Sequence, residues 1–299
     1  MPELPDIVVY IEALERRIVG QRLENVVIKN PFLLRSVDPP ISACVGQEVR
    51  TLRRLGKRIG IGLGNDVWMI LHLMIAGRLH WYDRDRARKV RPALLHLEFE
   101  NGVLTLTEAG TKRRASLHLT QGEAALAEFD RGGLEVLEHG FAEFRDRMQE
   151  RNHTLKRALT DPTILSGIGN AYSDEILHRA QLSPMTQTKS LSDAEWVRLH
   201  EATRVTLLEW TERLREETND SFPEKVTAFR EEMAAHGRYG KPCPVCGTLI
   251  QRIRYAENET NYCPRCQTGG KMLADRALSR LLKDDWPKSV EEWEKGRGS

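Results

Sequence analysis

The sequence predicts a multidomain α+β protein with an N-terminal β-sandwich behind a leading helix, a helical domain and a C-terminal zinc ribbon. Three observations support this fold class. Short β-rich runs separated by turn signals fill residues 22–120, helical periodicity dominates after residue 121, and four cysteines stand at zinc-ribbon spacing. Because 299 residues exceed one typical domain, we predict four segments: 1–120, 121–236, 237–268 and a tail, 269–299.

The first predicted element is an amphipathic helix over residues 6–19. Its apolar residues recur at helical spacing: Ile7, Tyr10, Ile11, Leu14 and Ile18. Pro5 falls in the first turn, where a helix tolerates proline. The β-rich runs that follow read ENVVIKN, RIGIGLG, VWMILHLMI and LLHLEFE, with the turn signals NPF, GND and ENG between them. VWMILHLMI is apolar on both faces, which is typical of a strand buried between sheets.

The second half of the chain predicts helices. The helical segments are EAALAEF, TLKRALT, AYSDEILHRAQ and the long amphipathic run 193–216. EETNDSFPE ends that run. KVTAFREEMAAH then predicts a short helix leading into the cysteine module, and LADRALSRLLKDD predicts another in the tail.

Charge is mixed overall but clustered locally. The formal net charge is +2 with 29% charged residues. The basic residues gather in three clusters: Arg50, Arg53, Arg54, Lys57 and Arg58; Arg84, Arg86, Arg88, Lys89 and Arg91; Lys112, Arg113 and Arg114. Such clusters suit a polyanion, although a solvated surface explains any single one equally well. No stretch approaches the roughly 20 apolar residues that span a bilayer, and the start lacks signal-peptide order, so we expect a cytoplasmic protein.

Four of the five cysteines form a metal-binding pattern. Cys243-x2-Cys246 and Cys263-x2-Cys266 have sixteen residues between the pairs, which predicts a four-thiolate ribbon with one structural Zn²⁺ per chain. Comparable peptides gain on the order of 10 kcal/mol from the metal. Ribbons are often purely structural, so metal binding alone does not establish contact with DNA. The fifth cysteine, Cys44, is expected to be a reduced packing residue.

Pro2 becomes the N-terminal residue if Met1 is removed, as is expected when the second residue is small. Since α-amino groups titrate near about pH 8, a useful fraction is unprotonated at neutral pH. A secondary amine can attack an aldehyde-like sugar carbon and form an iminium, which is an electron sink for elimination of a phosphate. Glu3 could shuttle protons, beside a helix start that favours its charged form. Taken alone, however, a proline near an N-terminus is an ordinary structural residue.

The segment SGIGNAYSDEILHRA, residues 166–180, predicts a tight turn before a helix. Gly167 and Gly169 permit the turn, and Asn170 lies where the helix begins. Free backbone N–H groups and an amide side chain there can meet a phosphate. An ordinary helix cap would have the same sequence.

Together these motifs resemble the formamidopyrimidine-DNA glycosylase and endonuclease VIII family. The resemblance runs from Met1 to about Gln267, in the right order and spacing. It rests on PELPDI, the lysine in LGKRIG, HLMIAGRLHWY, SGIGNAYSDEIL, HGRYGKPCPVCG and YCPRCQ. The family architecture is an N-terminal β-sandwich with a leading helix, a helix-two-turn-helix domain and a zinc finger, in agreement with the prediction above.

By this resemblance Pro2 is the nucleophile and Glu3 is the proton donor that helps to open the sugar. Lys57, grouped with these catalytic residues, looks like the family lysine that contacts a DNA phosphate near the lesion. His72 and Asn170 match other phosphate-contacting positions. These contacts would hold a kinked duplex while the damaged nucleotide is flipped out, because its sugar carbon is inaccessible inside the stack.

The implied enzyme is a bifunctional DNA glycosylase and abasic-site lyase of base excision repair. The base is displaced, a Schiff base joins Pro2 to the sugar, and β,δ-elimination of the 3′ and then the 5′ phosphate leaves a one-nucleotide gap. The resemblance further implies a monomer that binds damaged double-stranded DNA in the bacterial cytoplasm, associated with the nucleoid. It implies no membrane, no nucleotide cofactor and no catalytic metal.

The chain departs from the family in its zinc finger and its first helix. The finger hairpin usually carries an arginine before T-x-Y-C, and that DNA-contacting position reads Asn258 here. Loss of the cation should weaken binding and reduce its salt dependence by about one counterion. Arg252 or Arg254 could compensate. Asp6 replaces the usual glutamate, which keeps a carboxylate but shortens its reach.

Two elements that fill the space of a flipped base also differ. The family's void-filling methionine falls on Ile75, unless Met74 takes the role by a one-residue shift. The loop that normally carries an arginine and an intercalating phenylalanine reads EAGTKRRASL, with no aromatic residue. We expect Lys112, Arg113 and Arg114 to contact DNA there, with Arg113 or Arg114 entering the gap.

The segment TNDSFPEKVTAF is short compared with the loop that grips 8-oxoguanine in the purine-specific branch. It therefore favours oxidised pyrimidines, ring-opened purines or hydantoins. Two rival functions stay open: an abasic-site lyase with little base excision, and a catalytically silent DNA-binding zinc protein. Retention of both Pro2 and Glu3 argues against the silent protein, since binding alone needs neither.

Overall fold

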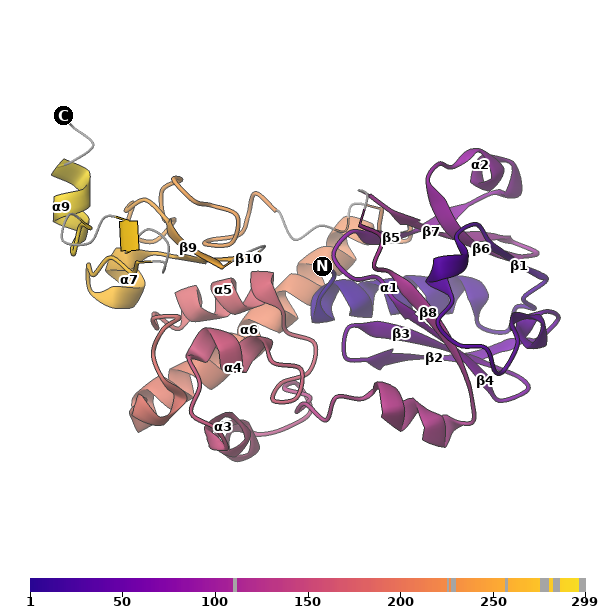
Figure 1. Ribbon diagram of the computed structural model, residues 1–299, viewed down its shortest axis with the longest axis horizontal. Helices are drawn as coiled ribbons and strands as arrows, with labels where there is room; N and C mark the ends of the chain where they lie inside the picture. The colour runs from indigo at the N-terminus through magenta and orange to yellow at the C-terminus, as the bar shows by residue number, and fades with distance from the viewer. Residues whose placement is uncertain are drawn as a thin grey trace. The chain divides into compact units, whose positions relative to one another are not determined.

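The computed structural model describes residues 1–109, 112–224, 226, 230–255, 258–274, 280–281 and 286–295. The chain divides into two compact units, Met1–Arg131 with Glu209–Thr227, and Gly132–Leu208 with Ala228–Ser299 (Figure 1). The boundary crosses the long helix α6 (Asp193–Thr218), whose C-terminal part, from Glu209 on, belongs to the first unit. The four-segment division of the sequence stays a prediction.

The first unit is built from two antiparallel sheets. One sheet has the order β2-β3-β4-β8: β2 (Val49–Leu55), β3 (Arg58–Leu63), β4 (Val67–His72) and β8 (Ser116–Gln121). The other has the order β1-β6-β7-β5: β1 (Asn25–Ile28), β6 (Ala93–Phe99), β7 (Gly102–Glu108) and β5 (Gly77–Tyr82). The turns η1 (Pro31–Leu33) and η2 (Ile41–Cys44) lie on the connection from β1 to β2, α2 (Arg84–Lys89) joins β5 to β6, and η3 (Glu123–Phe129) follows β8. The predicted sandwich fold is confirmed.

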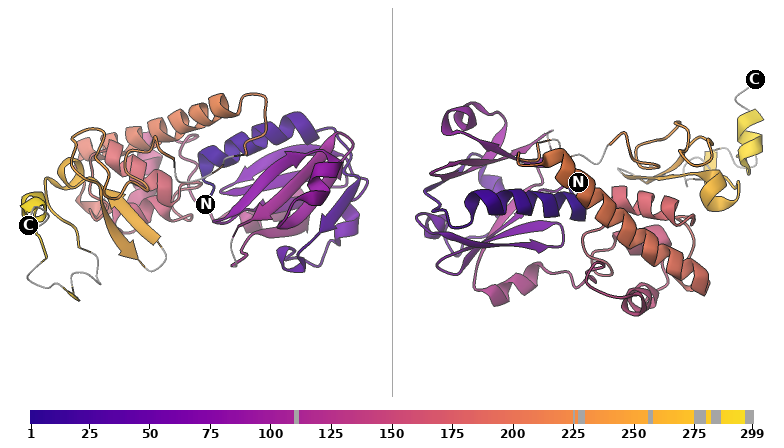
Figure 2. Two further views of the ribbon diagram at one scale, coloured as in Figure 1. Left: turned by 90° about the horizontal axis from the view of Figure 1, so that it is seen from above. Right: turned by 180° about the vertical axis from the view of Figure 1, so that it is seen from behind.

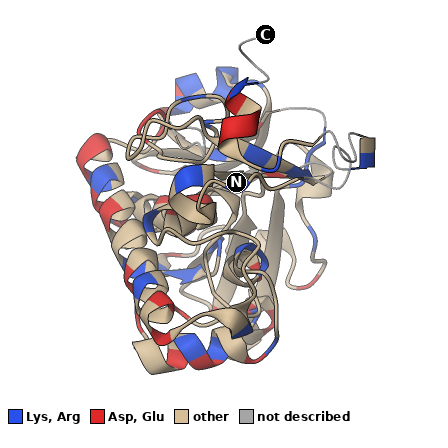
Figure 3. Ribbon diagram, turned by 90° about the vertical axis from the view of Figure 1, so that its left-hand side faces the viewer, with Lys and Arg blue, Asp and Glu red and all other residues tan. Residues whose placement is uncertain are grey.

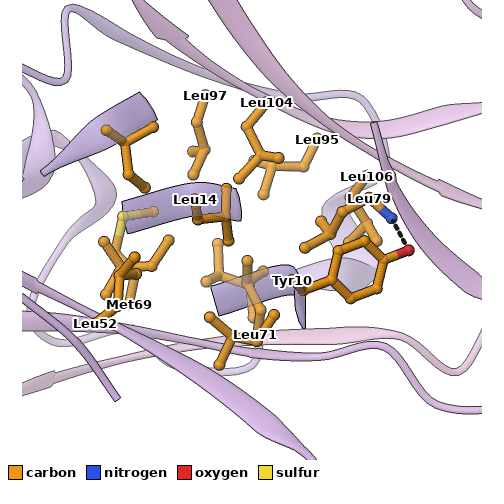
Figure 4. Close-up of a cluster of buried hydrophobic side chains, with 14 of the residues drawn as sticks. Tyr10, Leu14, Leu52, Met69, Leu71, Leu79, Leu95, Leu97, Leu104 and Leu106 are labelled. Carbon is orange, nitrogen blue, oxygen red and sulfur yellow. Dashed lines mark hydrogen bonds between the residues drawn. The ribbon is translucent and has the colours of Figure 1, made fainter. Parts of the chain in front are cut away.

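Helix α1 (Leu4–Ile18) is the predicted leading helix, and its apolar side enters the core. Figure 4 shows Tyr10 and Leu14 between leucines of the two sheets, with Leu97 on one side and Leu71 on the other. The Tyr10 hydroxyl accepts a hydrogen bond from the Leu79 N–H at 3.3 Å. The last turns of α6 run beside α1 (Figure 2), where Arg215 of α6 pairs with Glu12 of α1 at 2.6 Å.

Strand β4 is apolar on both faces for a different reason from the one predicted. Met69 belongs to the core that holds α1, whereas Trp68 and Ile70 belong to a second apolar cluster with Leu126. Leu126 lies on η3, which therefore covers the outer face of this sheet. One face of the strand packs into the core and the other is covered by the η3 turn. Both faces are therefore apolar, although a sheet covers only one of them.

The second unit is helical and ends in the cysteine module. It contains α3 (Phe141–Gln149), α4 (Leu155–Thr160), α5 (Asn170–Arg179), η4 (Thr188–Ser190), the N-terminal part of α6, the hairpin β9 (Gln251–Tyr255) and β10 (Asn258–Tyr262), α7 (Pro264–Thr268) and α9 (Val290–Lys295). The short helix predicted over 225–236 lies partly outside the described residues, and residues 230–236 form turns. The tail helix predicted over 273–285 lies mostly outside the described residues. No helix that the structure describes could cross a membrane.

Candidate functional site

The start of α1 forms a buried corner around Pro2 and Glu3. Pro2 is buried and Glu3 is only 2% exposed. Glu3 is the residue that caps the helix start, and its N–H donates to Asp6 Oδ2 at 2.9 Å. The Asp6 carboxylate thus holds the backbone of Glu3, and both acids lie where the helix dipole favours negative charge.

The electrostatics of this corner favour a neutral amine. Burial lowers the pKa of the Met1 amino group below its ordinary value, and the cations of Arg78 and Lys57 lower it further. The carboxylates of Glu3 and Asp6 oppose the shift. An amine here is therefore deprotonated at neutral pH more often than one in water.

Lys57 lies in the turn between β2 and β3, beside Gly56, whose φ of 62° is a backbone conformation that suits glycine. Burial lowers the pKa of Lys57, and the negative charge of Glu3 opposes this. Two residues that the sequence separates widely thus share one electrostatic environment.

His72 ends β4 in a cationic setting. Its cross-strand neighbours are Arg58 on β3 and Ser116 on β8. Burial, then the charges of Arg58, Lys57 and His118, lower the pKa of His72 to about 4. His72 is consequently neutral at pH 7 and can donate one hydrogen bond without carrying a charge. Sequence reasoning missed His118, although the two-residue periodicity of β8 could have placed it on this face.

The loop between β4 and β5 is tightly built. A Cβ on Gly77 would lie 2.2 Å from the Leu73 carbonyl oxygen, so only glycine fits there. Met74 has a positive φ of 54°. Ile75 is 53% exposed, and Arg78 Nη1 donates to the Ile75 and Gly77 carbonyls at 3.2 and 2.7 Å. The loop therefore presents an apolar side chain at a fixed position.

A buried carboxylate fastens the loop between β7 and β8. Glu108 is 1% exposed and ends β7. Its two oxygens accept hydrogen bonds from the Arg114 N–H at 2.9 and 3.1 Å and from the Ala115 N–H at 3.3 and 3.1 Å. Lys112, Arg113 and Arg114 are exposed. Sequence reasoning did not identify Glu108, because its partners are backbone N–H groups that reach it only after the loop has reversed the direction of the chain.

In the second unit, Asn170 begins α5 and is tied to the hairpin of the cysteine module. Its Nδ2 donates to the Glu259 carbonyl at 2.9 Å, which leaves one amide N–H for another partner. The Asn170 carbonyl accepts from Lys156 Nζ at 2.8 Å. The N-terminus of α5 and strand β10 are thereby held together.

Two acidic residues of α5 organise the chain before the cysteines. Asp174, fully buried, pairs with Lys156 at 2.5 Å and His236 at 2.7 Å. The Glu175 carboxylate accepts from the backbone N–H groups of Ala234, Ala235 and His236 at 2.8 to 2.9 Å. These bonds use donors that a helix would need, which explains the turns at 230–236.

The four predicted zinc ligands converge. The sulfur atoms of Cys243, Cys246, Cys263 and Cys266 all lie within 4.8 Å of one another. Zinc–sulfur bonds of about 2.3 Å in a tetrahedron place sulfurs roughly 3.8 Å apart, so this set fits one structural Zn²⁺. His178 Nε2 lies 3.2 Å from Cys243 Sγ.

The finger hairpin carries Arg252 and Arg254 on the strand that pairs with the one holding Asn258. Asn258 is exposed and pairs with Tyr255. Arg252 contacts Glu259 at 3.2 Å and stacks over the Tyr239 ring at 4.1 Å. Arg254 is exposed. Elsewhere in this unit charge is mixed: basic and acidic residues alternate along the helical ribbons (Figure 3).

Three family models match successive parts of the chain. They are the formamidopyrimidine-DNA glycosylase N-terminal domain at residues 1–116, the H2TH domain of the same protein at 133–220, and the zinc finger found in FPG and IleRS at 240–269.

Individual proteins match over most of the chain. The formamidopyrimidine-DNA glycosylase of Heliobacterium modesticaldum is 32% identical over 281 residues, covering 89% of this chain and 100% of the relative. A formamidopyrimidine-DNA glycosylase-like protein of Mycobacterium tuberculosis is 43% identical over 129 residues, covering 43% of this chain and 80% of the relative. Lactococcus lactis Fpg in complex with DNA containing an abasic site has a TM-score of 0.79 at 25% identity, covering 89% of this chain and 99% of the other.

Proposed function

Since this chain belongs to the formamidopyrimidine-DNA glycosylase family, and is thus a DNA glycosylase acting on damaged DNA, we propose that it removes oxidised bases and cleaves the abasic strand through Pro2. The observation that carries this proposal is the buried corner at the start of α1. There Glu3 sits at the helix start, and burial, with Arg78 and Lys57, lowers the pKa of the Met1 amine next to Pro2.

The proposed reaction begins when removal of Met1 frees the Pro2 nitrogen. That nitrogen bonds to the sugar C1′ as the bond from C1′ to the base breaks. The Glu3 carboxylate accepts the proton that the Pro2 nitrogen loses on bonding to C1′, while the base leaves with the electron pair of its bond to C1′. Glu3 then passes that proton to the ring oxygen, which opens the sugar and leaves an iminium between Pro2 and C1′. The iminium accepts the electron pair released when the C2′ proton is lost, so the 3′ phosphate departs, and a further elimination releases the 5′ phosphate.

The damaged nucleotide must leave the stack before this chemistry, and several residues are suited to hold the DNA. We assign phosphate contacts to Lys57, His72 and Asn170. His72 would donate a hydrogen bond as a neutral ring, whereas Lys57 would bring a charge. Relatives of this fold have been solved with abasic-site DNA and with DNA containing an oxidised pyrimidine.

The gap left by the flipped base would be filled by two loops. We assign Ile75 as the apolar wedge, because it is more exposed than Met74 and its loop is held by Arg78. The exposed cations Lys112, Arg113 and Arg114 would occupy the other side. Glu108 would keep their loop in place without touching DNA.

The segment after α6 supports oxidised pyrimidines, ring-opened purines or hydantoins as substrates. Phe222 and Val226 are buried in the core of the first unit, and the Phe222 ring lies 5.8 Å from that of Tyr10. These two residues pack into the unit and so contribute no side chain that could grip 8-oxoguanine, and the shortness of TNDSFPEKVTAF is the basis for the choice.

Single-turnover assays on duplexes with one oxidised pyrimidine, one 8-oxoguanine or one preformed abasic site test the proposal. We expect excision and incision of the pyrimidine lesion, and slower reaction at 8-oxoguanine. Incision of the abasic site without excision of any base would instead indicate the lyase rival. Glu3→Gln should retain DNA affinity and lose excision by several orders of magnitude, because the amide cannot donate the proton.

A further inference from the structure

Helix α2 forms a basic surface that the proposed chemistry does not use. It joins β5 to β6, and Figure 1 shows it at the far end of the sandwich from the N-terminus. Ala87 is the buried residue of this helix, and the Asp83 carboxylate caps it by accepting the Arg86 N–H at 2.7 Å. The α2 basic surface is defined by five exposed cations: Lys29, Arg86, Arg88, Lys89 and Arg91.

Neutral partners hold two of these cations in place. The Arg86 guanidinium lies 4.6 Å from the centre of the Tyr82 ring, which stacks on His80 with the ring centres 5.6 Å apart. Arg91 Nη1 donates to the Arg88 and Val90 carbonyls, both at 2.8 Å. Such contacts order the side chains without forming an ion pair, and the Glu224 carboxylate acts on the same His80 and Tyr82 rings.

Within the described part of the chain, no carboxylate pairs with Arg86, Arg88 or Lys89, whereas their neighbour Arg84 pairs with Glu24. Lys29 lies next to this segment, because its N–H donates to the Leu94 carbonyl at 2.9 Å. Burial lowers the pKa of His96, Lys29 and Arg91 lower it further and Glu98 opposes them, so both cations lie near one imidazole. The five cations therefore follow the segment between β5 and β6 along the length of the sheet, together with the exposed acids Asp83 and Asp85.

Helix α2 begins at the end of β5 that lies away from the N-terminal corner. Strand β5 connects the two: its Gly77 end adjoins the Ile75 loop and Arg78, and its Tyr82 end adjoins α2. Five steps along a strand at roughly 3.3 Å each give about 17 Å. Arg86, which stacks on Tyr82, is too far away to touch the phosphates that flank a nucleotide held in the corner. Lys29 and Arg91 lie at the other end of the sheet, where Ala93 of β6 and Arg78 of β5 both stand opposite Thr107 of β7.

We propose that the α2 basic surface is a second DNA-binding surface, which contacts phosphates of duplex DNA away from the lesion. The inference rests on the proposed function, because DNA is the polyanion that such an enzyme meets. Duplex DNA carries one negative charge per about 1.7 Å of helix axis, and fixed, unpaired cations gain affinity by releasing its counterions. The contact would be independent of sequence and would keep the enzyme on DNA between lesions.

An acidic protein fits this surface less well. Protein interfaces have an apolar centre and are depleted in lysine. No large apolar side chain among residues 82–93 is strongly exposed. Around α2 itself the surface offers charge without an apolar anchor, which is the pattern of phosphate contacts, while Phe32, three residues from Lys29, is 76% exposed.

The test is the salt dependence of binding to an undamaged 30-base-pair duplex, which requires no catalysis. Arg88→Glu/Lys89→Glu removes two cations of the surface, and Arg16→Glu/Arg22→Glu makes the same charge change at exposed residues of the same unit. We expect the first variant to flatten the slope of log affinity against log salt by about 1.8. Doubling the salt would then weaken the wild type about 3.5-fold more than the variant. The control should keep most of the wild-type slope.

Equal slopes for the wild type and Arg88→Glu/Lys89→Glu would overturn the inference, as would equal losses in both variants, which would indicate a general charge effect. The neutral variant Arg88→Gln/Lys89→Gln, checked for folding by circular dichroism, should give the same direction of change. Incision of a 13-base-pair lesion duplex should survive in all three variants. If the wild type itself does not incise the lesion duplex, the result counts against the proposed function alone. The binding slopes would still show whether α2 contacts DNA.

Discussion

Replacing Glu108 by glutamine, a side chain of the same shape, should loosen the loop between β7 and β8. Both carboxylate oxygens contact the N–H groups of Arg114 and Ala115. The amide has one acceptor oxygen, so in either orientation its NH2 group faces a backbone donor. An unsatisfied buried donor costs about 1–3 kcal/mol, and the remaining bond loses its charge assistance. The expected loss is therefore about 2–4 kcal/mol.

Hydrogen exchange at the amides of Arg114 and Ala115 measures this loss directly. A loss of about 2 kcal/mol in local opening energy speeds their exchange roughly 30-fold. Glu100→Gln, an exposed position in the turn between β6 and β7, should leave both amides unchanged. Unaltered exchange at Arg114 and Ala115 in Glu108→Gln would refute the clamp. If the loop fills the gap beside a flipped base, the same variant should slow excision while the salt slope of DNA binding is retained.

Three further changes test other parts of the structure. His178→Phe removes the hydrogen bond to Cys243 Sγ and should weaken zinc binding by about 10-fold, as measured by competition with a chelator; unchanged affinity would exclude a role for this contact. The folded pKa of His72 is about 4 against 6.5 unfolded, so the unfolded chain binds an extra proton between these values and stability falls as pH falls through this window. His72→Asn should reduce that fall in urea titrations, and an identical pH profile would contradict the assignment. Asn258→Arg should steepen the salt dependence of DNA binding by about one counterion. An unaltered slope would show that an arginine at this position makes no additional phosphate contact.

Local signals explain why much of the architecture was predictable. The helical spacing of Ile7, Tyr10 and Leu14 is a property of a short segment, and it correctly placed α1. The paired cysteines likewise define their own geometry, and the predicted zinc site is confirmed. Motifs such as PELPDI identified the family, which the family models and relatives confirm.

Contacts between distant segments were not predictable in the same way. Residues 230–236 have helical periodicity, yet the buried carboxylate of Glu175 takes their backbone donors and turns result. Helix α6 is continuous in sequence but contributes to both units, because Arg215 near its end pairs with Glu12 of α1. Neither partner carries a local signal for the other.

The assigned site residues depend on the same kind of information. A proline and a glutamate at the start of a chain predict little by themselves. Their setting becomes chemically informative only when Lys57 and Arg78 are brought near the N-terminal amine by the turn between β2 and β3 and by strand β5. These roles stay predictions until the amine itself is tested.

Borohydride trapping on a duplex with one abasic site tests the N-terminal amine most directly. The purified protein is compared with Pro2→Gly and with a form that retains Met1, all at equal DNA occupancy. We predict a covalent adduct in the wild type, with the reduced linkage mapped to Pro2 by mass spectrometry, and none in the form that retains Met1. Pro2→Gly, which offers a primary amine in place of the secondary one, should give far less adduct. An absent adduct with intact DNA binding, or an equal yield from the protein that retains Met1, would contradict catalysis by Pro2.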